Sequence, residues 1–138
     1  MNEIVPMTNE AIEKVRIFEA MLATLPQVNI ETDHVFHAGV YSRTVMIPAG
    51  IAITGVVIKI PTLLIVSGNA IVYIGGESKE LIGYHIIKGG ANRKQAFFAR
   101  EDTMLTMIFA SNAETIEDAE NEFTDEAEML ITRKEKGV

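Results

Sequence analysis

Gly39-Val-Tyr-Ser-Arg-Thr-Val-Met-Ile-Pro-Ala-Gly50 is the stretch of this 138-residue chain that decides its fold. Between Tyr41 and Ile47 the side chains alternate in polarity, which is typical of a β-strand with one buried and one exposed face. Pro48-Ala-Gly50 then supplies the residues of a turn. The stretch therefore predicts a strand whose buried face needs further strands to cover it.

The same texture extends from Phe36 to Ser111, where short runs of β-branched and aromatic residues are separated by turn residues. Many short strands joined by closely spaced turns favour a sandwich or a closed barrel. We expect strands at about 39–47, 51–59, 63–66, 70–75, 80–86, 94–99 and 103–109.

A helix is predicted before this region, because Thr8 or Asn9 can cap a segment that runs to about Thr24 and is closed by Pro26. Its apolar residues form a narrow seam, which either covers one end of the chain's own barrel or packs on a neighbouring subunit. The seam consists of Ala11, Val15, Phe18, Leu22 and Leu25, and the last four are our candidates for a subunit interface.

The pattern becomes helical again after Ser111. Asn112 is a good helix cap, and Ile116, Ala119 and Phe123 form a modest apolar stripe. Thr124 can cap a last short helix that runs through Glu128. We expect the carboxylates at 124–126 and the other carboxylates of the tail to lie on a solvated helix face.

Length and charge indicate one domain with appendages, namely a helical arm at 1–26, a β-barrel at 27–111 and an acidic helical tail at 112–138. The tail carries nine acids and three bases, and the whole chain has a net charge of −7. Such a chain repels nucleic acid. With no cysteine, no leader pattern and no apolar run long enough for a spanning helix, we expect a soluble protein in a reducing compartment, without membrane contact.

Four segments resemble, in this order, a group of small cupin-like proteins found in tailed-phage and prophage genomes: Gly39–Gly50, Thr54-Gly55, Val66-Ser-Gly68 and Arg100-Glu-Asp-Thr103. The similarity covers about residues 34–125. It implies a mainly β fold, a cupin (jelly-roll) barrel with an N-terminal helix and a C-terminal helical tail. It also implies a protein made in the host cytoplasm, and a place in the virion.

The resemblance further implies a His-x-His pair near Gly55 and another histidine after the glycine turn at 89–90. This chain has Ile58 and Ile60 at the first place, and Arg93 and Lys94 at the second. Isoleucine cannot coordinate a metal, and cationic side chains repel one. We therefore expect no metal and no other cofactor, with Ile58 and Ile60 on a strand filling the barrel.

Other polar residues are weaker candidates. His34 and His37 are spaced so that an extended chain directs them to opposite faces, which argues against a metal pair. Gly89-Gly90 is best explained as a turn that needs positive φ. For ligand binding at the barrel mouth the candidates are Tyr41, His85, Arg93 and Lys94. No nucleophile–base pair is visible, so we assign no catalytic residues.

Two functions remain open. The first is a non-enzymatic phage-encoded structural or interaction protein, a decoration, adaptor or assembly component, with copies of itself (a dimer or trimer) and other virion proteins as partners. The alternative is a metal-independent cupin that binds a sugar, nucleotide or signal molecule, or an enzyme using His, Tyr, Arg and Lys at the barrel mouth. A pocket lined by the four candidates would favour the alternative.

Overall fold

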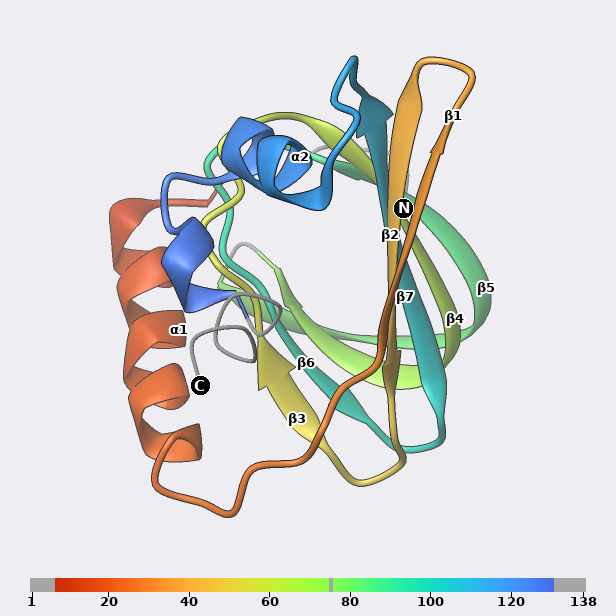
Figure 1. The fold of residues 1–138 in the computed structure, drawn as a ribbon. Coiled ribbons are helices and arrows are strands. Elements are labelled where there is room, and N and C mark those ends of the chain that lie inside the picture. Colours follow the sequence, from red (N-terminus) through yellow and green to blue (C-terminus); the bar gives the residue numbers. More distant parts are fainter. Residues whose placement is uncertain (1–6, 75, 131–138) are drawn as a thin grey trace.

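One strongly curled antiparallel sheet dominates the computed structural model, which describes residues 7–74 and 76–130 (Figure 1). Its strands are β1 (Thr32–His37), β2 (Val40–Ile47), β3 (Ala52–Thr54), β4 (Thr62–Ile74), β5 (Glu77–Gly89), β6 (Ala96–Ala99) and β7 (Thr103–Ala110). They are ordered β1-β2-β7-β4-β6-β3, and β5 pairs with β4. The expected mainly β fold is confirmed.

The deciding stretch forms β2, paired along its length with β7. Tyr41, Arg43 and Ile47 are buried on the concave face of the sheet, as the alternation predicted. The hairpin that joins β1 to β2 turns at Ala38 and Gly39, both with positive φ. The sequence does not predict strand β1, because the first expected strand begins at about residue 39.

The predicted break between the strands at 63–66 and 70–75 is wrong, since β4 continues through it as a single 13-residue strand. Gly68 lies opposite Gly83 of β5, and both have positive φ. A Cβ on Gly68 would lie 2.5 Å from Thr103 Oγ1. The glycine therefore bends a continuous strand against β7 where the sequence predicted a turn between two strands.

The predicted strand at 51–59 is also wrong beyond Thr54. Strand β3 covers Ala52–Thr54, and the following segment is irregular except for a single bridge between Ile58 and Arg93. Ile58 and Ile60 are half-buried and pack against the core. They therefore contribute to the interior from a loop, and not from alternate positions of a strand.

Helix α1 (Asn9–Leu22) begins as predicted, because Thr8 Oγ1 accepts a hydrogen bond from the Ala11 amide. Helix α2 (Ile116–Phe123) is capped by Thr115 and not by Asn112. The last turn is a 3-10 helix, η1 (Ala127–Met129), which has no side-chain cap. Thr124 accepts instead from the Glu126 amide two residues on.

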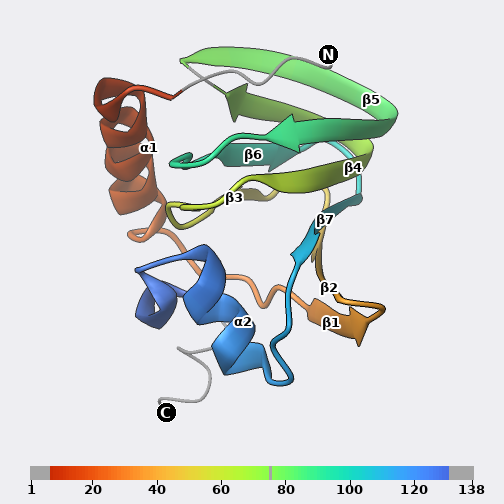
Figure 2. The ribbon, with the colours of Figure 1, turned by 90° about the horizontal axis from the view of Figure 1, so that it is seen from above.

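The two α-helices lie away from the middle of β5 (Figure 2): α1 lies beside β3, and α2 lies beside the end of β7 and the start of β2. Ala11 and Val15 of α1 are buried against the chain's own fold. Phe18 and Leu22 are half-buried, whereas Leu25 is 53% exposed. The inner part of the seam thus serves this chain's own core.

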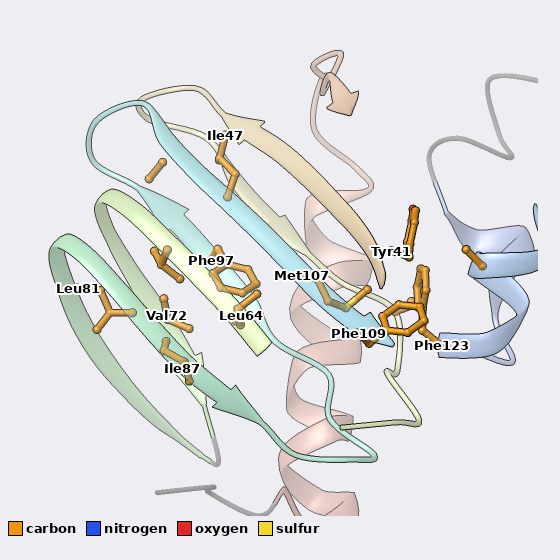
Figure 3. Packing of buried hydrophobic residues seen from close by; sticks show 14 residues of the cluster. Tyr41, Ile47, Leu64, Val72, Leu81, Ile87, Phe97, Met107, Phe109 and Phe123 are labelled. Atoms are coloured by element: carbon orange, nitrogen blue, oxygen red, sulfur yellow. The ribbon is translucent and has the colours of Figure 1, made fainter. Parts of the chain in front are cut away.

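The core fills the concave side of the sheet, where side chains from β2, β4, β5, β6 and β7 converge (Figure 3). Phe123 of α2 closes one end of it by packing on Phe109, with ring centroids 6.0 Å apart. No helix in the described ranges is long and apolar enough to cross a membrane.

Candidate functional site

Arg93 is the most unusual side chain in the interior. It follows the turn after β5, it is only 5% exposed, and its backbone is bridged to Ile58. Its guanidinium donates to Thr62 Oγ1 at 2.5 Å, to the Gly90 carbonyl at 2.8 Å and to the Ile60 carbonyl at 3.3 Å. The side chain therefore ties the segment that leads into β4 to the turn that follows β5.

The remaining contacts of Arg93 are also with neutral groups. Its Nε donates to Gln95 Oε1 at 3.4 Å, and Nη2 lies 3.9 Å from Met107 Sδ. Burial lowers the pKa of Arg93 to about 10, so the group still carries its charge at neutral pH. Among the described residues, none of the ion pairs involves Arg93. Within the described ranges, this buried cation is held by hydrogen bonds without a carboxylate.

Gly89 makes room for this guanidinium. Gly89 lies opposite Thr62 in the β4–β5 pairing, and a Cβ there would be 2.5 Å from Arg93 Cζ. Positive φ occurs in this turn at Asn92 and not at the two glycines. The explanation of Gly89-Gly90 as a positive-φ turn is therefore wrong, because at Gly89 the requirement is space.

A second buried network joins α2 to the sheet. Arg43 Nη1 donates to Glu120 Oε2 at 2.9 Å, and both side chains are less than a tenth exposed. The same nitrogen donates to the Tyr41 hydroxyl at 3.3 Å, which lies 2.7 Å from His34 Nδ1. Arg43 also stands over the ring of Phe123, 5.5 Å from its centroid. We call this network the α2 latch; it consists of Arg43, Glu120, Tyr41, His34 and Phe123.

Burial raises the pKa of Tyr41, against the opposing effect of the Arg43 charge, so the phenol stays neutral. Arg43 faces Met107 across the β2–β7 pairing. Opposite residues of an antiparallel pair point to the same face. The two buried arginines, Arg43 and Arg93, therefore flank Met107 on the concave face, one neutralised by Glu120 and the other not.

Glu120 was missed by the sequence analysis, which placed the tail carboxylates in solvent. It is fully buried. A signal was present, because Glu120 lies four residues after Ile116 and three before Phe123, on the apolar face of α2. A carboxylate on such a face needs a buried cation, and Arg43 supplies it.

Lys94 points away from Arg93, toward α1. Its Nζ donates to Glu19 Oε2 at 2.9 Å and to the Gly55 carbonyl at 2.7 Å. Glu19 accepts a second hydrogen bond from Thr54 Oγ1. Lys94 is almost completely buried, so this arrangement is a helix anchor and is closed to a ligand.

Glu126 provides a further anchor for α1 and the C-terminal segment. It accepts from Arg16 Nη2 and from the Val57 amide, each at 3.0 Å. Desolvation disfavours its ionised form, but the Val57 hydrogen bond and the Arg16 charge outweigh that effect and lower the pKa of Glu126. The expectation of a solvated carboxylate is wrong here too.

The four ligand candidates do not share one set of contacts. Tyr41 belongs to the α2 latch, Arg93 to the interior cross-link and Lys94 to the α1 anchor. His85 lies half-buried on β5, with Nε2 2.8 Å from the Ile82 carbonyl. The hydrogen bonds of the four thus connect four different parts of the fold.

A metal centre of the cupin type does not fit the residues present. In the described part of the chain, no three His, Asp or Glu side chains are placed to hold an ion. The implied ligand positions hold Ile58, Ile60 and Arg93, with Thr62 bound to the guanidinium. His34 contacts Tyr41, while His37 is exposed on the other face of β1, as an extended segment predicts.

Comparison with solved structures identifies the fold. The chain is similar to a cupin superfamily protein from Desulfitobacterium hafniense, with TM-score 0.50 and 14% identity over 66% of this chain and 88% of that one. It is also similar to KdgF from Halomonas sp., with TM-score 0.51 and 17% identity over 64% and 88%. A cupin domain of an XRE family transcriptional regulator from Enterobacter cloacae gives TM-score 0.50 and 12% identity over 60% and 98%.

No protein-family model and no curated protein sequence matches the chain. The structural similarity at such low identity defines a cupin-like fold, a curled antiparallel half-barrel with a helix at each end of the chain. The cupin fold implied by the resemblance is thereby confirmed.

Proposed function

We propose that the protein is a non-catalytic, metal-independent cupin-fold interaction subunit that assembles with copies of itself. The observation that carries the proposal is the Arg93 cross-link. Where a cupin metal would need neutral nitrogen or carboxylate donors, a buried guanidinium binds Thr62 and the carbonyls of Ile60 and Gly90. A cation of the protein itself thus occupies this part of the interior.

The other polar clusters support the same proposal. The Arg43–Glu120 pair and the Lys94–Glu19 pair each connect a helix to the sheet. Side chains committed to such buried contacts hold the fold together. The function then belongs to the outer surface, where partners bind.

The test is metal content. Elemental analysis of the dialysed full-length protein should find far less than one transition-metal ion per chain, and added Zn²⁺, Mn²⁺ or Ni²⁺ should leave its melting temperature unchanged. A ligand that binds the native state raises the melting temperature. One ion per chain that survives dialysis would contradict the proposal.

The proposed setting is a phage or prophage, with the subunit associated with the virion. Support for this step comes from the resemblance over residues 34–125. Genes flanking the coding sequence should then encode virion or packaging proteins, and the protein should be found by mass spectrometry in purified particles. Flanking genes of a sugar-metabolism operon would count against a phage role.

The Arg93 charge favours one second candidate, a binder of small anions. A buried guanidinium that has no carboxylate partner among the described residues is a cation that an anionic ligand could neutralise. Under this alternative, inorganic phosphate or citrate raises the melting temperature of the wild type but not of Arg93→Gln. An equal or absent response in both proteins rejects the binder.

A further inference from the structure

The outward face of β5 is apolar in the middle and charged at both ends. Ile82, Tyr84 and Ile86 are 63%, 64% and 52% exposed. On the opposite face of the strand, Leu81 and Ile87 are buried and His85 is half-buried. Exposed Glu80 precedes them and exposed Lys88 follows them on the same face. Large apolar side chains gathered this way mark an interaction surface.

The edge of β5 that faces away from β4 lies beside this face. In the described part of the chain β5 pairs with β4, from Glu77 to Gly89, and no strand pairs with its other edge. Both α-helices lie elsewhere (Figure 2). An exposed strand edge presents unpaired backbone N–H and C=O groups, which can pair with the strand of another chain.

The order of residues along β5 identifies the occupant. Reading outward residues in either direction from Tyr84 gives an isoleucine and then a charge, Glu80 at one end and Lys88 at the other. We propose that a second copy of this chain pairs its β5 antiparallel to this edge, with Tyr84 opposite Tyr84. The inference rests on the self-assembly in the proposed function, and it names the surface.

The charges select this register. With Tyr84 on the two-fold axis, Glu80 of each copy faces Lys88 of the other, and Ile82 faces Ile86. A two-residue shift places a charge opposite an isoleucine, because Glu80 then faces Ile86 or Lys88 faces Ile82. A one-residue shift would place outward residues opposite inward ones. Opposite charges across paired strands stabilise the pair, and like charges destabilise it.

Glu80 also forms an ion pair with Arg100 of its own chain. The Glu80 side chain remains 62% exposed, so it can accept a second cation. Lys88 of the second copy would join a pair that is already formed.

The main alternative surface for a dimer interface is the exposed apolar stripe of α1, which includes Ile17 and Met21.

Cysteine cross-linking tests the register directly, because the chain has no cysteine of its own. Tyr84→Cys should form a disulfide-linked dimer under mild oxidation, since directly opposed Cα atoms lie within disulfide range. Ile86→Cys alone should not, because its two copies would be four residues apart, about 13 Å. An equimolar mixture of Ile82→Cys and Ile86→Cys should cross-link. Cross-linking of Tyr84→Cys no faster than that of Ile86→Cys would overturn the proposal.

Charge exchange gives a second, independent readout by sedimentation. Glu80→Lys and Lys88→Glu should each lose the dimer, because like charges then face each other, and a mixture of the two variants should restore it. Lys14→Glu, an exposed change on α1, is the matched control and should stay dimeric. Circular dichroism and melting temperature confirm that each variant is folded.

The outcomes separate the two claims. One outcome is a wild-type dimer that persists in both β5 charge variants but dissociates in the double variant Ile17→Asp/Met21→Asp. That result overturns the β5 interface and leaves the proposal of self-assembly intact. A wild-type monomer at micromolar concentration overturns both.

Discussion

Arg93 and Glu120 show how a charged residue can be a core residue. Arg93 is charged and buried, and its guanidinium donates hydrogen bonds to neutral oxygen atoms, among them Thr62 Oγ1 and the Gly90 carbonyl. Glu120 is buried on the apolar face of a short acidic helix, where Arg43 neutralises it. In both places the charged side chain binds a residue that lies far away in the sequence. Such hydrogen bonds fix the relative position of the two segments more specifically than apolar contacts would.

Gly89→Ala tests the close approach of the guanidinium. The new Cβ would lie 2.5 Å from Arg93 Cζ, so the variant should lose about 1–3 kcal/mol of unfolding free energy through overpacking. In an Arg93→Ala background the same change should cost less than about 0.5 kcal/mol, because the obstacle is gone. Urea unfolding of the four proteins measures this coupling. Equal costs in the two backgrounds would show that space is not the reason for Gly89.

Glu120→Leu tests the α2 latch. Removing the carboxylate leaves the Arg43 charge buried without it, and breaking such a pair costs about 3–5 kcal/mol. Replacing Arg43 by leucine as well should recover much of that loss, because two apolar side chains can take the place of the pair. Urea unfolding is again the measurement. A double variant no more stable than Glu120→Leu would contradict this account of the latch.

At the scale of elements, the sequence predicted the helices better than the strands. The bounds of α1 follow from local signals, the Thr8 cap and the apolar seam. The course of β4 depends on contacts across the sheet, since Gly68 bends the strand against Gly83 and Thr103 instead of ending it. Residues after Thr54 leave the strand pattern and are tied to Arg93 by a single bridge, which no local pattern reveals.

The site was predictable to a similar extent. The sequence indicates Arg93 and Lys94 as candidates, because they stand where the resemblance implies a histidine. Their partners could not be inferred, because Thr62 and Glu19 come from distant segments. The two adjacent cations point in different directions, one into the interior and one toward α1, and only the three-dimensional arrangement separates their roles.

Acid should loosen the contact of α1 with the C-terminal segment. The pKa of Glu126 is lowered in the fold from its ordinary 4.5, so its contribution to stability is present above about 4.5 and is lost as the pH falls through the lowered value. Glu126→Gln should therefore be less stable than wild type near neutral pH, and the difference should shrink as the pH falls below about 4.5. Chemical unfolding at a series of pH values measures this. Exposed Glu122→Gln is the control, and a difference for Glu126→Gln that stays constant with pH would contradict the linkage.

On the scale of the whole molecule, Arg93 occupies part of the interior of the cupin-like half-barrel and binds Thr62. Ion pairs attach α2 and α1 to the sheet, through Glu120 and Glu19. Among the described strands, β5 has the most exposed apolar side chains in alternation, on its outer face. The proposed function of this protein therefore depends on its outer surface and not on a site inside the barrel.

Native mass spectrometry of the full-length protein tests the central claim most directly, because one spectrum reports both assembly and bound ions. We expect the mass of two chains, with no transition metal and no retained small molecule. Single chains that each carry one transition-metal ion would contradict both the metal-independent interior and the self-assembling subunit.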